Sequence, residues 1–149
     1  MSVSLYGSGN TVIQVVSANY NTSTSTTSTS YVTTGLSATI TPQSTTSKIL
    51  IMASVPVYVA GAPASGLVTV YRGATNLALT SGATQLAFSQ NYNNSTNNAA
   101  NSSLFFLDSP ATTSSTTYTI YFSSPQAVST YVFNNNNTGS VVLQEIAYS

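Results

Sequence analysis

Charge is nearly absent from this chain, and histidine and cysteine are absent altogether. The charged residues are Lys48, Arg72, Asp108 and Glu145, which make up 3% of 149 residues and give a formal net charge of zero. An ordinary soluble domain carries roughly a quarter charged residues, and net charge is what keeps monomers apart in solution. The composition therefore predicts a subunit that packs against copies of itself or against a larger assembly.

The missing side chains exclude most catalytic and metal-binding arrangements. A serine or cysteine hydrolase needs a base, usually histidine, and a structural zinc site needs cysteine or histidine ligands. A glycosidase needs two carboxylates, for which only Asp108 and Glu145 are available. Asp108 precedes Ser109 and Pro110, a pattern typical of a strand end and turn in which the aspartate caps local amides. We predict that the protein is not an enzyme and holds no cofactor or metal.

Long apolar runs and basic clusters are also missing. The longest apolar run, 49–62, is interrupted by Ser54 and Pro56 and is shorter than the ~20 residues that cross a bilayer. Residues 1–16 lack the basic start of a signal peptide. With only two cations there is no basic patch for nucleic acid or anionic lipid. We expect neither nucleic acid nor a membrane among its partners.

The residues that are present indicate strands and turns. Apolar residues alternate with small polar ones in short runs, and glycine, proline, asparagine or clusters of serine and threonine separate these runs. We predict an all-β fold, an antiparallel, jelly-roll-like β-sandwich of about ten strands, with an arm at residues 1–10 and one domain at 11–149. The expected strands are 11–18, 30–34, 37–41, 48–58, 67–72, 76–80, 85–90, 103–107, 116–122, 127–133 and 140–148.

Three strand features carry more detailed predictions. Residues 48–58 are nearly all apolar, which indicates a central strand covered on both faces. Pro56 lacks a donor, so pairing should break or bulge there. Residues 72–75 should form a hairpin turn, because Gly73 can adopt a positive φ.

The most polar segments are expected to be loops. Residues 19–29 are either a flexible loop, which we favour, or an arm that pairs through its hydroxyls. Residues 91–101 and 134–139 are predicted loop tips. The asparagines at 134–137 could offer oxygens to calcium, but no carboxylate is near in sequence, which favours a solvated turn. Tyr92, Asn93 and Asn94 form the best candidate ligand loop, for a sugar that stacks and hydrogen-bonds. Tyrosine also anchors protein interfaces, and both uses stay open.

Two further groups are candidates for packing contacts. Val3, Leu5 and Tyr6 precede a Gly-Ser-Gly joint, so they are either a frayed end or an arm that anchors the subunit to a neighbour.

Glu145 falls in the last predicted strand and should be partly buried. A buried carboxylate needs a partner, and we expect Arg72, whose planar fork suits a carboxylate better than Lys48 does. The alternative is a solvated Glu145 at a sheet edge.

Four segments of the chain, in matching order, resemble a β-rich module of tailed-phage virion proteins. They are 31–50 (YVTTGLSATITPQSTTSKIL), 71–78 (YRGATNLA), 107–118 (LDSPATTSSTTY) and 141–147 (VVLQEIA). The module is frequent in phages of cyanobacteria and marine bacteria, often near the end of tail-fibre-like chains. The resemblance implies a non-enzymatic virion protein with a β-sandwich fold, and it carries over no binding residues.

Only about ten residues precede the module, which suggests a small separate subunit. We therefore expect a capsid decoration (cement) protein or a head-fibre subunit on the virion surface, capsid or tail. The alternative is a tail-fibre or fibre-tip module that binds a receptor or glycan. The expected partners are other copies of the chain in a homotrimer, the major capsid protein or other virion proteins, and, for the alternative, a host surface glycan.

Overall fold

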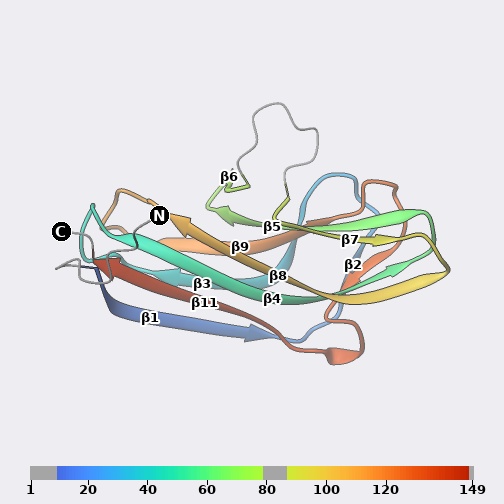
Figure 1. The fold of residues 1–149 in the computed structure, drawn as a ribbon, viewed down its shortest axis with the longest axis horizontal. Coiled ribbons are helices and arrows are strands. Elements are labelled where there is room, and N and C mark those ends of the chain that lie inside the picture. Colours follow the sequence, from blue (N-terminus) through green and yellow to red (C-terminus); the bar gives the residue numbers. More distant parts are fainter. Residues whose placement is uncertain (1–9, 79–86, 148–149) are drawn as a thin grey trace, which may run out of the picture.

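Alternating side chains produce two antiparallel sheets that pack face to face in this computed structural model, which describes residues 10–78 and 87–147 (Figure 1). The elements are β1 (Thr11–Tyr20), β2 (Thr24–Thr26), β3 (Val32–Ile40), β4 (Lys48–Ala60), β5 (Ala64–Arg72), β6 (Thr75–Asn76), β7 (Ser89–Asn93), β8 (Asn97–Asp108), β9 (Thr116–Ser123), β10 (Thr130–Val132), the 3₁₀ turn η1 (Asn134–Asn136) and β11 (Gly139–Ala147).

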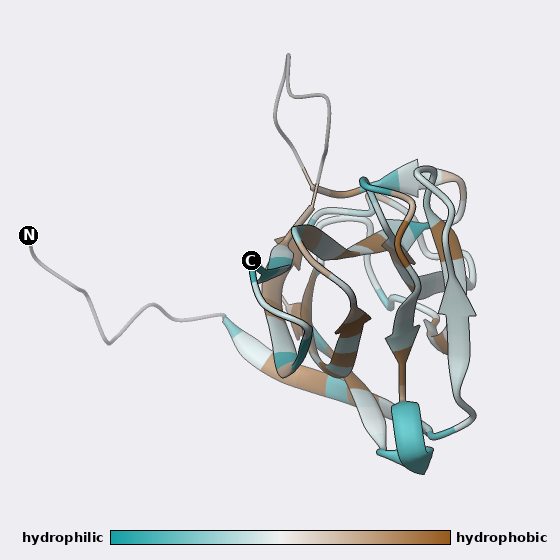
Figure 2. Ribbon diagram, turned by 90° about the vertical axis from the view of Figure 1, so that its right-hand side faces the viewer, coloured by the Kyte–Doolittle hydropathy of each residue, from teal (hydrophilic) through white to brown (hydrophobic). Residues whose placement is uncertain are grey.

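The strand order confirms the predicted fold class. One sheet has the order β1-β11-β4-β8, and the other has the order β3-β9-β5-β7. The short strands β10 and β2 continue the first sheet beside β4, and β6 pairs with β5. Two four-stranded sheets connected in this order form a jelly roll. Figure 2 shows the two layers from one end of the molecule.

The core lies between the sheets and follows the period of two. Tyr118, Ile120 and Phe122 of β9 are fully buried, as their alternation with Thr119 and Tyr121 predicts. They pack in one cluster with Ile49 and the other inward side chains of β4. Burying each such side chain stabilises the fold by roughly 1.5–3 kcal/mol.

Strand β4 is central, as predicted, but only its inner face is covered. Its side chains alternate strictly between buried and half-buried, so Leu50 and Met52 lie on the outer face. Pairing with β8 continues past Pro56, contrary to the expected break. On the other edge of β4, the pairing with β11 extends only to Ser54, and the pairing with β10 extends only from Val57 onward. The missing Pro56 donor falls in this gap, so the prediction is right at one edge of β4 and wrong at the other.

A bulge merges two predicted strands into β3. The register with β9 shifts between Thr33 and Ser37, and Gly35 has a φ of 87°. Thr34 replaces the interrupted ladder: its hydroxyl donates to the carbonyl of Ile120 at 2.9 Å and accepts from the Leu36 amide at 3.1 Å. Short polar side chains satisfy backbone groups in this way, which alternation alone does not reveal.

Several predicted loops are strands. Residues 19–29 include the end of β1 and all of β2, which pairs with β10, so the favoured flexible loop is wrong. Most of 91–101 belongs to β7 and β8, and the predicted strand 127–133 shrinks to β10. Neighbouring strands decide these segments more than intrinsic propensity does. The hairpin turn at 72–75 is confirmed, with Gly73 at a φ of 56°.

Candidate functional site

The charged residues gather at one end of the sandwich. Lys48 begins β4, Arg72 ends β5, and Asp108 ends β8. Asp108 and Glu145 lie on either side of Ile49, each directly opposite it in a neighbouring strand. Both carboxylates therefore face the interior with Ile49, and both are buried.

Asp108 holds a compact polar cluster with Arg72 and Tyr118. Arg72 Nη1 donates to the two carboxylate oxygens at 2.7 and 2.8 Å, and the Tyr118 hydroxyl donates to Oδ2 at 2.7 Å. Burial, and then the neighbouring Asp108, raise the pKa of the Tyr118 hydroxyl. Asp108 thus ends its strand as predicted but binds distant side chains instead of capping local amides. This cluster joins the ends of β5, β8 and β9.

Glu145 is fully buried, where partial burial was expected, and its predicted pair with Arg72 is wrong. Its Oε1 accepts from the backbone N–H of Gln43 at 2.7 Å. The side-chain amide of Gln14, turned so that its nitrogen faces the carboxylate, donates to Oε2 at 3.1 Å. Arg72 lies in the other sheet, opposite Tyr118, and forms its ion pair with Asp108. Lys48 lies on the outer face of β4, where its ammonium donates to Ser109 Oγ.

The three residues of the candidate ligand loop, Tyr92, Asn93 and Asn94, do not share one binding surface. Tyr92 and Asn93 belong to β7, and their side chains point to opposite faces of the sheet. Asn93 is 2% exposed, and its amide nitrogen donates to the carbonyls of Gly61 at 2.7 Å and Val59 at 3.3 Å. Of the three residues, only Tyr92 and Asn94 are exposed. The predicted arm residues Val3, Leu5 and Tyr6 lie outside the described residues.

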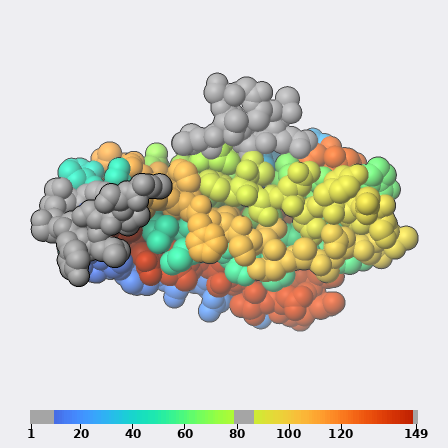
Figure 3. All heavy atoms as spheres, viewed as in Figure 1, coloured from blue at the N-terminus to red at the C-terminus, as the bar shows by residue number. Residues whose placement is uncertain are grey.

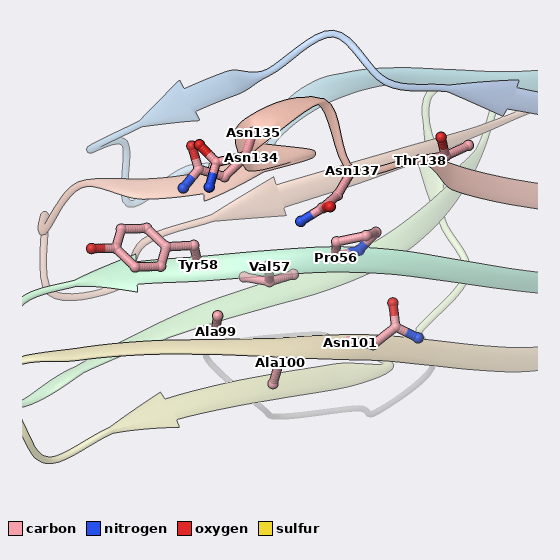
Figure 4. Close-up of a pocket in the computed structure, with 10 residues that line it drawn as sticks. All are labelled: Pro56, Val57, Tyr58, Ala99, Ala100, Asn101, Asn134, Asn135, Asn137 and Thr138. Carbon is pink, nitrogen blue, oxygen red and sulfur yellow. The ribbon is translucent and has the colours of Figure 1, made fainter.

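A groove beside η1 hollows the described surface. We name it the asparagine groove; its volume is about 580 Å³, within the range of roughly 300–1,000 Å³ typical of ligand pockets. Figure 4 shows the amides of the η1 loop on one side and the Tyr58 ring on the other. The lining residues are Pro56, Val57, Tyr58, Ala99, Ala100, Asn101, Asn134, Asn135, Asn137 and Thr138.

An apolar surface occupies the other half of the same sheet. We name it the apolar face; Figure 3 looks onto this side of the molecule, with β8 in orange beside β4 in teal and β11 in red. Phe105 is 69% exposed and Val15 is 57% exposed. The register places on this outer face the side chains Val12, Val15, Leu50, Met52, Phe105, Leu107, Val142 and Ile146.

Sequence reasoning missed both surfaces, although signals for each are present. The apolar runs at 48–58 and 104–107 place apolar residues on both strand faces, which a half-buried strand does not need. The asparagine run at 134–137 is a signal for the groove, but from the sequence it indicates a solvated turn or, less well, a calcium site. What the sequence does not show is that β4 lies between β8 and β11, which brings these segments together.

Within residues 10–78 and 87–147, no cluster of histidine, cysteine, aspartate and glutamate could hold a metal ion. No helix among them is long and apolar enough to cross a membrane. No model of a known protein family matches the chain, and no curated protein matches it either.

Proposed function

We propose that this protein is a non-enzymatic structural subunit of a virion surface, a capsid decoration or head-fibre protein that assembles as a homotrimer. The observation that carries the proposal is the apolar face on a chain with only four charged residues. Monomers rarely expose apolar patches larger than a few hundred Å², and such patches mark interfaces. The resemblance to the phage module supports the virion as its location, with the major capsid protein or other virion proteins as further partners.

The apolar face has the composition of an interface between copies. It combines an aromatic side chain with aliphatic ones, and its single charge, Lys48, lies at its edge opposite Ile146. Such depletion of charge is typical of interface cores. A polar row, formed by Asn19, Ser54, Ser103 and Ser140, borders it within the same sheet. Jelly rolls occur in viral capsid proteins, although a fold alone does not establish a function.

Self-association tests the proposal directly. Light scattering of the full chain should show an oligomer, and Phe105→Ser should weaken it by about tenfold or more, the factor that ~1.4 kcal/mol represents. Full burial of a phenylalanine is worth roughly 1.5–3 kcal/mol, and Phe105 has most of its surface to bury. The matched control is Tyr92→Ser, because Tyr92 is 55% exposed but lies on the other sheet. A monomer at high concentration would contradict the assembly.

Copy number on the particle distinguishes the two virion roles. Antibody labelling of phage particles that carry the protein should decorate the whole head if it is a decoration subunit. Labelling of a few copies at the tail would favour the alternative, a tail-fibre or fibre-tip module that binds a host receptor or glycan. Absence of the chain from purified particles would contradict both roles.

A further inference from the structure

We propose that the asparagine groove binds an uncharged carbohydrate, between the Tyr58 ring and the amides of the η1 loop. The inference does not rest on the proposed assembly role, because the groove and the apolar face share no residue. Figure 4 shows the amides of Asn134 and Asn135 side by side above the Tyr58 ring, with Asn137 farther along the groove.

The amides that line the groove have unused hydrogen-bonding capacity. The side chains of Asn134, Asn135 and Asn137 make no hydrogen bond with any of the described residues. By contrast, Asn101 at the opposite wall donates to Ser54 Oγ at 2.8 Å. Each free amide offers an oxygen acceptor and two N–H donors. This pairing of donor and acceptor matches the neighbouring hydroxyls of a sugar, each of which both donates and accepts.

Backbone geometry does not account for all of these asparagines. Asn135 and Asn136 have φ values of 57° and 58°, a left-handed conformation that asparagine tolerates better than most residues. Asn137 has a φ of −59°, and Asn134 is not among the residues of positive φ. Positive φ therefore does not explain asparagine at those two positions, whereas binding through the side-chain amides does.

The loop is held in place before any ligand arrives. Phe133, which precedes η1, is fully buried and packs edge-on against Tyr20 with ring centroids 5.5 Å apart. The backbone N–H of Asn137 donates to the backbone carbonyl of Asn134 at 3.3 Å and closes the turn. Gly139 leaves room for the Phe133 ring, since an added Cβ there would lie 2.2 Å from it. A fixed loop reduces the entropy cost of binding.

The lining also selects the class of ligand. No charged residue lines the groove, and the described cations lie at the far end of β4 and β5. An anionic sugar would find no counter-charge there. Tyr58 supplies an aromatic ring that packs against Tyr131 in a tilted arrangement, with ring centroids 5.7 Å apart. Such rings supply contact area at little entropy cost, and they suit the apolar C–H face of a pyranose.

Binding can be measured on the full chain by NMR titration with defined oligosaccharides. The probes are maltotetraose, chitotetraose, a mannotetraose and a galactose-containing tetrasaccharide, with sialyllactose as the anionic comparison. We expect at least one neutral probe to shift the resonances of Tyr58 and of residues 134–138 in a saturable manner. No saturable shift with any neutral probe at millimolar concentration would overturn the proposal, and so would tighter binding of sialyllactose.

Variants separate the amides from the backbone. Asn135→Gly keeps the left-handed turn and removes an amide, and Asn137→Ala removes an amide at an ordinary φ. We expect each, and Tyr58→Ala, to weaken binding by about tenfold, while Tyr58→Phe retains it. Tyr92→Ala should change nothing. Unchanged affinity in both asparagine variants would overturn the proposal. Light scattering of the same variants keeps this test distinct from that of assembly.

Discussion

At the scale of single residues, both carboxylates of this chain are used inside the fold. The Asp108 carboxylate accepts hydrogen bonds from Arg72 and Tyr118, whereas the Glu145 carboxylate accepts them from the neutral amides of Gln43 and Gln14. The two carboxylates flank the same strand, yet among the described residues only Asp108 forms an ion pair. Their roles are therefore different: an ion pair that ties two sheets together, and a buried acceptor that holds a connection.

We predict that Asp108→Asn lowers the free energy of unfolding by about 2–3 kcal/mol. Removing the carboxylate weakens two charge-assisted contacts; the Arg72 side chain is 31% exposed, so solvent offsets part of the loss. Urea denaturation of Asp108→Asn, Arg72→Gln and the double variant measures the coupling, which should be about 1–3 kcal/mol. A coupling near zero would show that the pair contributes nothing to stability.

At the scale of elements, β3 shows how one glycine allows a strand to change register. Gly35 has a φ of 87°, and the Tyr20 ring covers it so closely that an added Cβ would lie 2.7 Å from Cζ. Tyr20 in turn packs against Phe133. The bulge, the end of β1 and the loop that carries the asparagine groove therefore form one packed unit.

Gly35→Ala should destabilise the protein by about 2–3 kcal/mol, from backbone strain and the contact with Tyr20. Gly73→Ala is the matched control, because its φ of 56° imposes similar strain with nothing within 4 Å. We expect the control to lose only about 1 kcal/mol. Thermal or urea unfolding measures both, and equal losses would mean that Tyr20 yields without cost.

At the scale of the whole molecule, buried tyrosines supply the predicted pH dependence. Burial raises the pKa of Tyr31 to about 12. Burial, and then the charge of Tyr121, raise the pKa of Tyr71, and the pKa of Tyr118 is raised as well. A raised folded-state pKa means that the neutral hydroxyl is favoured by folding. This stabilisation is fully present below the unfolded value of about 10 and is lost as pH rises through the folded values.

We expect the free energy of unfolding to stay level from about pH 7 to pH 9 and to fall above about pH 10. Denaturant midpoints at several pH values measure it, and tyrosinate absorbance reports ionisation in parallel. Tyr118→Phe should make the decline shallower, because one buried hydroxyl no longer resists ionisation. If the free energy of unfolding falls equally steeply in Tyr118→Phe, the loss of stability at high pH comes from groups other than Tyr118.

The sequence alone determined the class of the fold and the alternation within its strands. Alternation separated the two faces of β9 and β11 and led to the expectation that Glu145 is at least partly buried, because side chains on a strand change face at every residue. The shortage of charge likewise pointed to packing surfaces rather than to catalysis. These properties are local or compositional, so they do not depend on which strands become neighbours.

Only the tertiary structure decided which distant residues meet. Arg72 reaches Asp108 instead of Glu145 because of the jelly-roll order, and Asn93 turns inward because its segment is a strand. Because β4 lies between β8 and β11, the side chains of the apolar face come together and Tyr58 lies opposite the η1 loop. Pairing over such separations depends on the packing of whole sheets, which no local pattern in the sequence specifies.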